Sequence, residues 1–195
     1  MKKLNVICLS LLLGAALSCK ETKKDVEKVS DDVEEAVEIA IEEVEETVIS
    51  FQMEPKSDSN VQGMVKFVEK DGQVSMSASF SGLSPGEHAI HIHEKADCSS
   101  ADGKSTGGHW NPTAEPHGKW GDAGGFHKGD IGNFLANEDG SAEVSFETDA
   151  WCIGCGDPNK DILGKAVIVH QGVDDFTSQP SGAAGARISC TGIIE

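Results

Sequence analysis

All seven histidines of the chain lie between positions 88 and 170. His91 and His93 are separated by one residue, and on a strand this spacing places both rings on one face, about 6.5–7 Å apart. Imidazole is a borderline-soft donor that suits copper and zinc, and a mixed set of histidine and carboxylate suits zinc. The other candidate ligands are His109, His117, His127, Asp130 and His170. A strand pair, a loop triplet and a strand end together predict a metal centre.

Short strand-like runs separated by turns surround these histidines. The runs occupy residues 61–68, 73–80, 87–94, 131–136, 142–146, 165–170 and 186–194. Lys70-Asp71-Gly72 joins the first two runs and residues 137–140 join the fourth and fifth, as in β-hairpins. Many short strands with turns between them predict an all-β protein, built as an antiparallel sandwich or barrel.

A long stretch from Ala96 to Gly129 is rich in glycine and aspartate and shows no convincing periodicity. An irregular loop of about thirty residues is unusual in a compact domain unless something orders it. A metal ion, a disulfide or both would provide that order, which directs attention to the histidines and cysteines.

Composition limits the classes of partner. The chain has 195 residues, of which 33 are acidic and 16 basic, for a formal net charge of −17. This excess of acid argues against a nucleic-acid partner, because phosphate backbones attract the opposite sign. The 22 glycines favour a loop-rich β protein over a helical bundle, in which interior glycine is costly.

The first 18 residues have the pattern of an export signal. A basic start is followed by an apolar run, residues 4–17, that is too short to span a bilayer. The run ends at Ala16-Leu17-Ser18-Cys19, which resembles a bacterial lipoprotein signal with Cys19 as the lipidated first residue of the mature chain. An ordinary cleaved signal with an incidental cysteine is the alternative. Both interpretations predict export to the bacterial cell envelope and permit disulfides, and the first adds a lipid anchor in the membrane.

Residues 19–57 are expected to form an acidic tether ahead of a domain at 58–195. Between positions 20 and 49 there are 12 acidic and 4 basic residues. A narrow apolar stripe at a helical period runs through Val26, Val29, Val33, Val37, Ile41, Val44 and Val48. We interpret this segment as a solvated helical tether, with a short dimerising coiled coil as the alternative.

The domain resembles a known family at several short motifs. They are His91-Ile92-His93-Glu94, His109-Trp110-Asn111-Pro112, His117-Gly118, His127-Lys128-Gly129-Asp130-Ile131-Gly132-Asn133, Val169-His170 and Gly185-Ala186-Arg187-Ile188-Ser189-Cys190. In this order, residues 87–195 closely resemble the copper/zinc superoxide dismutases, and residues 61–86 fit the first strands of their fold. The resemblance covers about 135 residues and implies a Greek-key β-sandwich with long metal-binding loops.

The same resemblance implies two metal sites that share one ring. The copper ligands would be His91, His93, His109 and His170. The zinc ligands would be His109, His117, His127 and Asp130, with the His109 ring bridging the two ions. Asp174 matches a carboxylate that links His91 to His117, and His88 matches a framework residue that is not a ligand.

Arg187 and the cysteines complete the inferred site. Arg187, the only arginine in the chain, matches the guanidinium that guides the anionic substrate. Cys98 and Cys190 match the disulfide of the family. Cys152 and Cys155 depart from the family pattern. We favour a tight local disulfide between these two, over a free thiol pair or a metal-capture site.

The resemblance implies an enzyme that dismutes superoxide to oxygen and hydrogen peroxide with a redox-cycling copper. A non-enzymatic module that buffers copper or zinc in the cell envelope on the same fold is the alternative function. Subunit contacts vary among members of the family, so a homodimer stays open. Residues 171–186 look shorter and less charged than in the animal enzymes, so substrate attraction would depend mainly on Arg187.

Overall fold

The computed structural model describes residues 46–194. The signal peptide, Cys19 and the tether up to residue 45 lie outside the described residues, so these expectations stay predictions. Within residues 46–194 no helix is long and apolar enough to cross a membrane.

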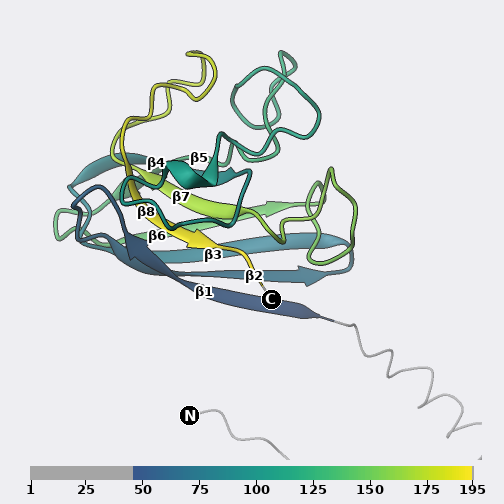
Figure 1. Ribbon diagram of the computed structural model, residues 1–195, viewed down its shortest axis with the longest axis horizontal. Helices are drawn as coiled ribbons and strands as arrows, with labels where there is room; N and C mark the ends of the chain where they lie inside the picture. Colours follow the sequence, from purple (N-terminus) through teal and green to yellow (C-terminus); the bar gives the residue numbers. More distant parts are fainter. Residues whose placement is uncertain (1–45, 195) are drawn as a thin grey trace, which may run out of the picture. The chain divides into compact units, whose positions relative to one another are not determined.

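The described part of the chain contains eight strands, paired antiparallel and connected by turns and long loops (Figure 1). They are β1 (Thr47–Pro55), β2 (Gln62–Lys70), β3 (Gln73–Ser81), β4 (Gly86–His93), β5 (Gly132–Ala136), β6 (Ala142–Thr148), β7 (Ala166–His170) and β8 (Arg187–Gly192). Their order in the sheet is β5-β4-β7-β8-β1-β2-β3-β6. The expected all-β class is confirmed.

The sheet curls on itself because its two ends are joined by a short turn. β5 and β6 stand at opposite ends of the strand order but are consecutive in the chain, separated only by residues 137–141. Five residues span at most about 18 Å, so the two ends must approach each other. The result is a near-barrel, in which Figure 1 shows β4, β5 and β7 in a layer above β1, β2 and β3.

The seven predicted strands are present, with bounds that differ from the expectation by at most two residues. The first hairpin forms where Lys70 pairs with Gln73, leaving a two-residue turn of Asp71 and Gly72. Both turn residues have positive φ, 52° and 75°. This is the backbone of a type I′ turn, which an Asp-Gly sequence favours because glycine adopts positive φ without strain.

The expected end of the tether is wrong. Residues 47–55, which we placed in the tether, form β1, which pairs with β2 from Thr47 to Met53 and with β8 at Glu54 and Pro55. The helical stripe of valines upstream obscured an alternation of Ile49, Phe51 and Met53 along this strand. The sheet therefore starts at Thr47, ahead of the expected domain boundary at residue 58.

Two kinds of strand build the core. Buried side chains alternate with exposed ones in the middle of β2, at Val65 and Phe67, and along most of β3 from Val74. Such alternation is typical of a sheet with one face in water. β7 is instead buried along its whole length and β4 along its last six residues. Ile90 and Ile92 of β4 belong to the main core cluster, so His91 and His93 face the other side, beneath the long loops.

The segment between β4 and β5 is irregular, as expected. Its only regular element is a single 3₁₀ turn at Lys104–Thr106. A disulfide between Cys98 and Cys190 ties the start of the loop to β8. Backbone hydrogen bonds from Trp110 to Ile92 and from Ile92 to Gly129 hold two further points of the loop against β4. The loop therefore takes its order from the strands that it covers.

Candidate metal centre

Two groups of buried side chains have the geometry of metal sites. The first contains His91, His93, His109 and His170. The second contains His109, His117, His127 and Asp130. In each group the candidate ligand atoms all lie within 4.8 Å of one another, and all seven residues are buried. β4 and β7 supply three of the rings, and the long loop supplies the rest.

In the first group, each strand histidine uses one ring nitrogen in a hydrogen bond and keeps the other free. His91 donates from Nε2 to Asp174 Oδ2 at 2.8 Å, and His93 donates from Nδ1 to the carbonyl of Gly107 at 3.0 Å. His170 donates from Nδ1 to the carbonyl of Gly185 at 3.4 Å. The other nitrogens are buried without a hydrogen-bond partner: His91 Nδ1, His93 Nε2, His109 Nε2 and His170 Nε2.

Buried ring nitrogens without a hydrogen-bond partner are suited to coordinate a metal ion. Buried polar atoms nearly always have a partner, so four of them gathered in one place need an explanation. A neutral imidazole that donates from one nitrogen presents a lone pair at the other. Metal-bound histidines have this arrangement, with the second nitrogen donating to a carboxylate or a carbonyl.

In the second group, three rings converge on one carboxylate. Asp130 Oδ1 lies 2.8 Å from His109 Nδ1 and 3.2 Å from His127 Nδ1, and its Oδ2 lies 3.0 Å from His117 Nδ1. The Nδ1 atoms of His117 and His127 are close to the carboxylate yet make no hydrogen bond with it. Three nitrogens and one oxygen directed to a common point are the ligand set of a four-coordinate zinc site.

The His109 ring belongs to both groups. Its Nδ1 lies in the second group beside Asp130, whereas its buried Nε2 has no hydrogen-bond partner and lies in the first group. The ring centroid is 4.0 Å from that of His91 and 5.6 Å from that of His127. The position of His109 is set by a backbone bridge to His93. A single imidazole can therefore contact two ions here.

Asp174 connects the two groups, because it accepts a hydrogen bond from one histidine of each. Its Oδ2 accepts the hydrogen bond from His91, and its Oδ1 accepts one from His117 Nε2 at 2.8 Å. The loop is held here by Asn133, whose side chain accepts from the backbone N–H of Asp174 at 2.8 Å and donates to its carbonyl at 2.9 Å. Sequence reasoning did not single out Asn133 for this role, although it lies three residues after Asp130.

The protonation states suit ligands. Burial lowers the pKa of His93 and of His170 well below the ordinary value of 6.5. Burial also lowers the pKa of His109, to about 4, although Asp130 opposes the shift. These rings are therefore neutral at pH 7 and their lone pairs are available.

The carboxylates are ionised. Burial raises the pKa of Asp130, but the hydrogen bonds from the His109 ring and the His127 backbone N–H, together with the nearby rings of His117 and His127, outweigh this and hold the pKa well below 3.8. The pKa of Asp174 is lowered in the same way by His117 and His91. Burial lowers the pKa of His117, but the two carboxylates outweigh it and raise this pKa to about 9. A charged imidazole in the metal-free protein must lose its proton before that nitrogen binds a cation.

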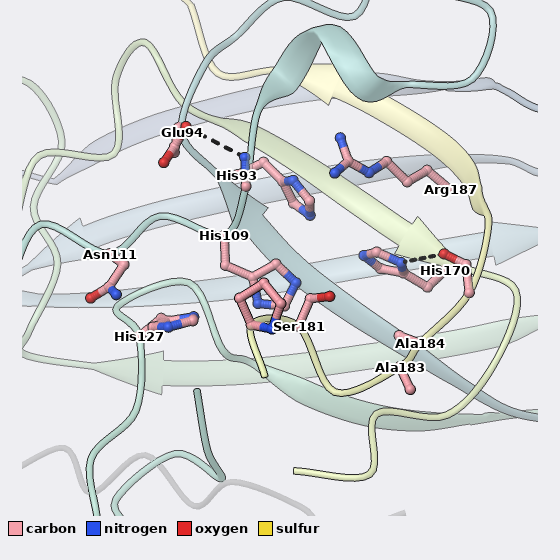
Figure 2. Close-up of a pocket in the computed structure, with 13 residues that line it drawn as sticks. His93, Glu94, His109, Asn111, His127, His170, Ser181, Ala183, Ala184 and Arg187 are labelled. Carbon is pink, nitrogen blue, oxygen red and sulfur yellow. Dashed lines mark hydrogen bonds between the residues drawn. The ribbon is translucent and has the colours of Figure 1, made fainter. Parts of the chain in front are cut away.

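A cleft of about 530 Å³ gives access to the first group. It is lined by His93, His109, His170 and Arg187, among others, and Figure 2 shows the guanidinium of Arg187 directed toward His93. Arg187 is held by hydrogen bonds from Nη1 to the carbonyl of Gly103 at 2.9 Å and to Thr106 Oγ1 at 3.0 Å. Arg187 thus places a fixed positive charge in the lining of the cleft.

The remaining predicted residues lie outside the two groups. Cys152 and Cys155 form a second disulfide, in the segment between β6 and β7. His88 donates from Nδ1 to the backbone carbonyl of His170 at 2.9 Å, and its Nε2 contacts Ser84. It supports the end of β7, and it is absent from both metal-binding groups.

Residues 61–194 match the family model of copper/zinc superoxide dismutase (SODC). The chain belongs to this family. A crystal structure of an SOD-like protein from Bacillus subtilis is 31% identical, with a TM-score of 0.66, and the match covers 74% of this chain and 97% of that one. A double mutant of that protein, with two substitutions to histidine, is 32% identical, with a TM-score of 0.67 and coverage of 75% and 97%. The clock protein EA4 is 31% identical, with a TM-score of 0.64 and coverage of 77% and 96%.

Proposed function

We propose that this protein dismutes superoxide: two superoxide anions and two protons give one oxygen and one hydrogen peroxide. The observation that carries the proposal is the His109 ring, which presents one buried nitrogen to each of two metal-binding groups. Copper would be held by His91, His93, His109 and His170. Zinc would be held by His109, His117, His127 and Asp130.

Copper, when bound, supplies one-electron chemistry between two adjacent oxidation states, which zinc cannot supply because it has no redox chemistry. The chain supplies the rest. The hydrogen bonds of His91, His93 and His170 fix the tautomer of each ring, so that the free nitrogens keep their direction. Asp130 and Asp174 provide the negative charge that balances the cations.

Arg187 would bind the anionic substrate in the cleft. With a formal net charge of −17, the protein repels superoxide at long range, so local positive charge is valuable. Arg187 is the one arginine in the sequence, and its guanidinium is half-buried beside the first group.

His109 would move a proton. Its Nδ1 is held beside Asp130, so the ring cannot turn freely, and the residue lines the cleft. Nε2 can therefore take up a proton in the first half of the cycle and donate it to the reduced substrate in the second. Water supplies the other proton of hydrogen peroxide.

The deciding experiment measures superoxide consumption by the full chain loaded with copper and zinc, together with the content of each metal. One copper and one zinc per chain with rapid consumption are the expected result. Full copper content without activity would instead support the envelope metal-buffering module. We include this alternative because the solved relatives from Bacillus subtilis are called SOD-like proteins.

We also propose an exported, lipid-anchored protein. The two disulfides and the family are typical of proteins outside the cytosol. The anchor is inferred from Ser18-Cys19 in the sequence. Expression with a labelled fatty acid should mark the wild-type protein and leave Cys19→Ala unmarked. Label retained in Cys19→Ala would contradict lipidation at this residue.

A further inference from the structure

The side chain of Gln179 is paired with the backbone of His117, 62 residues earlier in the chain. The backbone N–H of His117 donates to Gln179 Oε1 at 2.9 Å, and Gln179 Nε2 donates to the carbonyl of His117 at 2.9 Å. The amide thus satisfies both peptide groups of one residue, as a neighbouring strand would. It connects the loop after β7 to the loop between β4 and β5.

The same turn also packs against the ring of His117. Gly182 has φ of 63°, and a Cβ at this position would overlap Asp174 Oδ1 and lie 2.7 Å from His117 Nε2. The turn is closed by hydrogen bonds from Asp175 N–H to the carbonyl of Gly182 and from Gly182 N–H to the carbonyl of Ser178. A residue without a side chain is therefore required where the turn covers the Asp174–His117 hydrogen bond.

We propose that Gln179 is a positioning residue for the candidate zinc ligand His117. This inference rests on the proposed function. Asp174 fixes the Nε2 end of the ring, and Gln179 fixes the backbone from which the ring projects. With both ends held, Nδ1 points into the second group before any ion arrives. His117 lies in an irregular loop, where no strand or helix holds its backbone, and the adjoining restraint is the Gly118 N–H, which donates to Asp130 Oδ2 at 3.3 Å.

The test is the zinc affinity of the metal-free full chain, measured by competition with a chromophoric zinc chelator. Gln179→Ala should bind zinc about tenfold more weakly than the wild type, the lower end of the effect typical for residues that orient a metal ligand. Gln171→Ala is the matched control. It lies in the same loop, its side chain is exposed, and it makes none of the side-chain hydrogen bonds found within residues 46–194. Its zinc affinity should equal that of the wild type.

A second measurement separates positioning from general stabilisation. Zinc should raise the melting temperature of Gln179→Ala by less than it raises that of the wild type. A purely structural role would lower the metal-free and zinc-loaded melting temperatures equally and leave the affinity unchanged, which would overturn the inference. Failure of the wild type itself to bind zinc would overturn the proposed metal centre instead.

Gln179→Glu keeps the test decisive if the alanine variant does not fold. Glutamate retains the acceptor for His117 N–H but loses the donor for its carbonyl. Zinc affinity should fall several-fold, and Gln171→Glu controls for the added charge. Wild-type affinity in Gln179→Glu would count against the positioning role.

Discussion

At the scale of single residues, a substitution of Arg187 can test substrate attraction without disturbing metal binding. Its guanidinium is held by Gly103 and Thr106 and makes no hydrogen bond to the candidate metal ligands in the described part of the chain. Arg187→Ala should therefore keep its copper and zinc while the second-order rate constant for superoxide falls by about tenfold, a typical size for local electrostatic steering. Pulse radiolysis and metal analysis measure the two quantities. Equal loss of metal and activity would refute the guiding role.

His109→Ala tests the shared ring. The substitution removes a nitrogen from each of the two groups, so zinc affinity should fall by at least about tenfold and copper should lose one ligand. Metal content after dialysis and the electron paramagnetic resonance spectrum of the copper-loaded variant check both effects. Arg187→Ala is the matched control, because it lines the same cleft and should keep the wild-type spectrum. An unchanged zinc content in His109→Ala would argue against a bridging ring.

The sequence was informative about these residues in two ways. The gathering of histidines and an aspartate indicated a metal centre, because imidazole and carboxylate are ligands of copper and zinc. The individual ligands and the role of Arg187 were implied by the resemblance of the short motifs to the copper/zinc superoxide dismutases. Asn133 and Gln179 could not be recognised, because their roles arise from contacts with backbone groups 41 and 62 residues away. Amide side chains carry no comparable signature in a sequence.

At the scale of elements, the Cys98–Cys190 disulfide restrains the long loop. It joins residues 92 apart, and in the chain-entropy model its loss should destabilise the fold by roughly 4 to 5 kcal/mol. Replacing both cysteines by serine should lower the free energy of unfolding by that amount in urea denaturation. The loop also carries Gly103, which holds Arg187, so superoxide consumption should fall as well.

The second disulfide is the matched control for this prediction. Cys152 and Cys155 are only three residues apart, so the same model gives about 2 kcal/mol for replacing both by serine. Their segment also has other support, because Asp161 accepts hydrogen bonds from the backbone of Gly154, Gly156 and Leu163. A larger loss from the Cys152 and Cys155 pair than from Cys98 and Cys190 would contradict the loop-length argument.

The strands with one exposed face could be predicted from the sequence. β1 could not, because it directly follows a segment with a helical pattern of valines. β2 and β3 alternate clearly and are joined by Asp71-Gly72, so both their period and their register follow from local chemistry. β1 follows directly on the valine stripe of the acidic segment, and Val48 continues that stripe into the strand. The burial that distinguishes the two patterns comes from packing against β2 and β8, and β8 lies at the far end of the described residues.

At the scale of the whole molecule, the metal-free protein should lose stability in acid. His93, His109 and His170 have folded pKa values below 6.5, so the unfolded chain binds more protons than the folded chain below that pH. For His109, the shift to about 4 corresponds to stability on the order of 3 kcal/mol that is present above pH 6.5 and lost toward pH 4. Asp130 and Asp174, whose pKa values are lowered, act in the same direction at lower pH.

His117 acts in the opposite direction. Its pKa is raised to about 9, so its contribution is complete below pH 6.5 and is lost as the pH rises through 9. The metal-free protein should thus be most stable near neutral pH, with the steeper loss on the acid side. Urea unfolding between pH 4 and pH 9 measures this profile. Stability that rises steadily toward pH 4 would contradict the neutral, buried state of the three rings.

The place of β1 in the sheet decides how the chain can be shortened. β1 lies between β8 and β2, so a truncation at residue 58 would delete an interior strand rather than a leader. Both neighbours would then expose unpaired peptide groups, which recruit strands from other molecules and lead to aggregation. One of those neighbours, β8, begins with Arg187, which lines the cleft. A soluble version intended for crystallisation or kinetics should therefore begin upstream of Thr47.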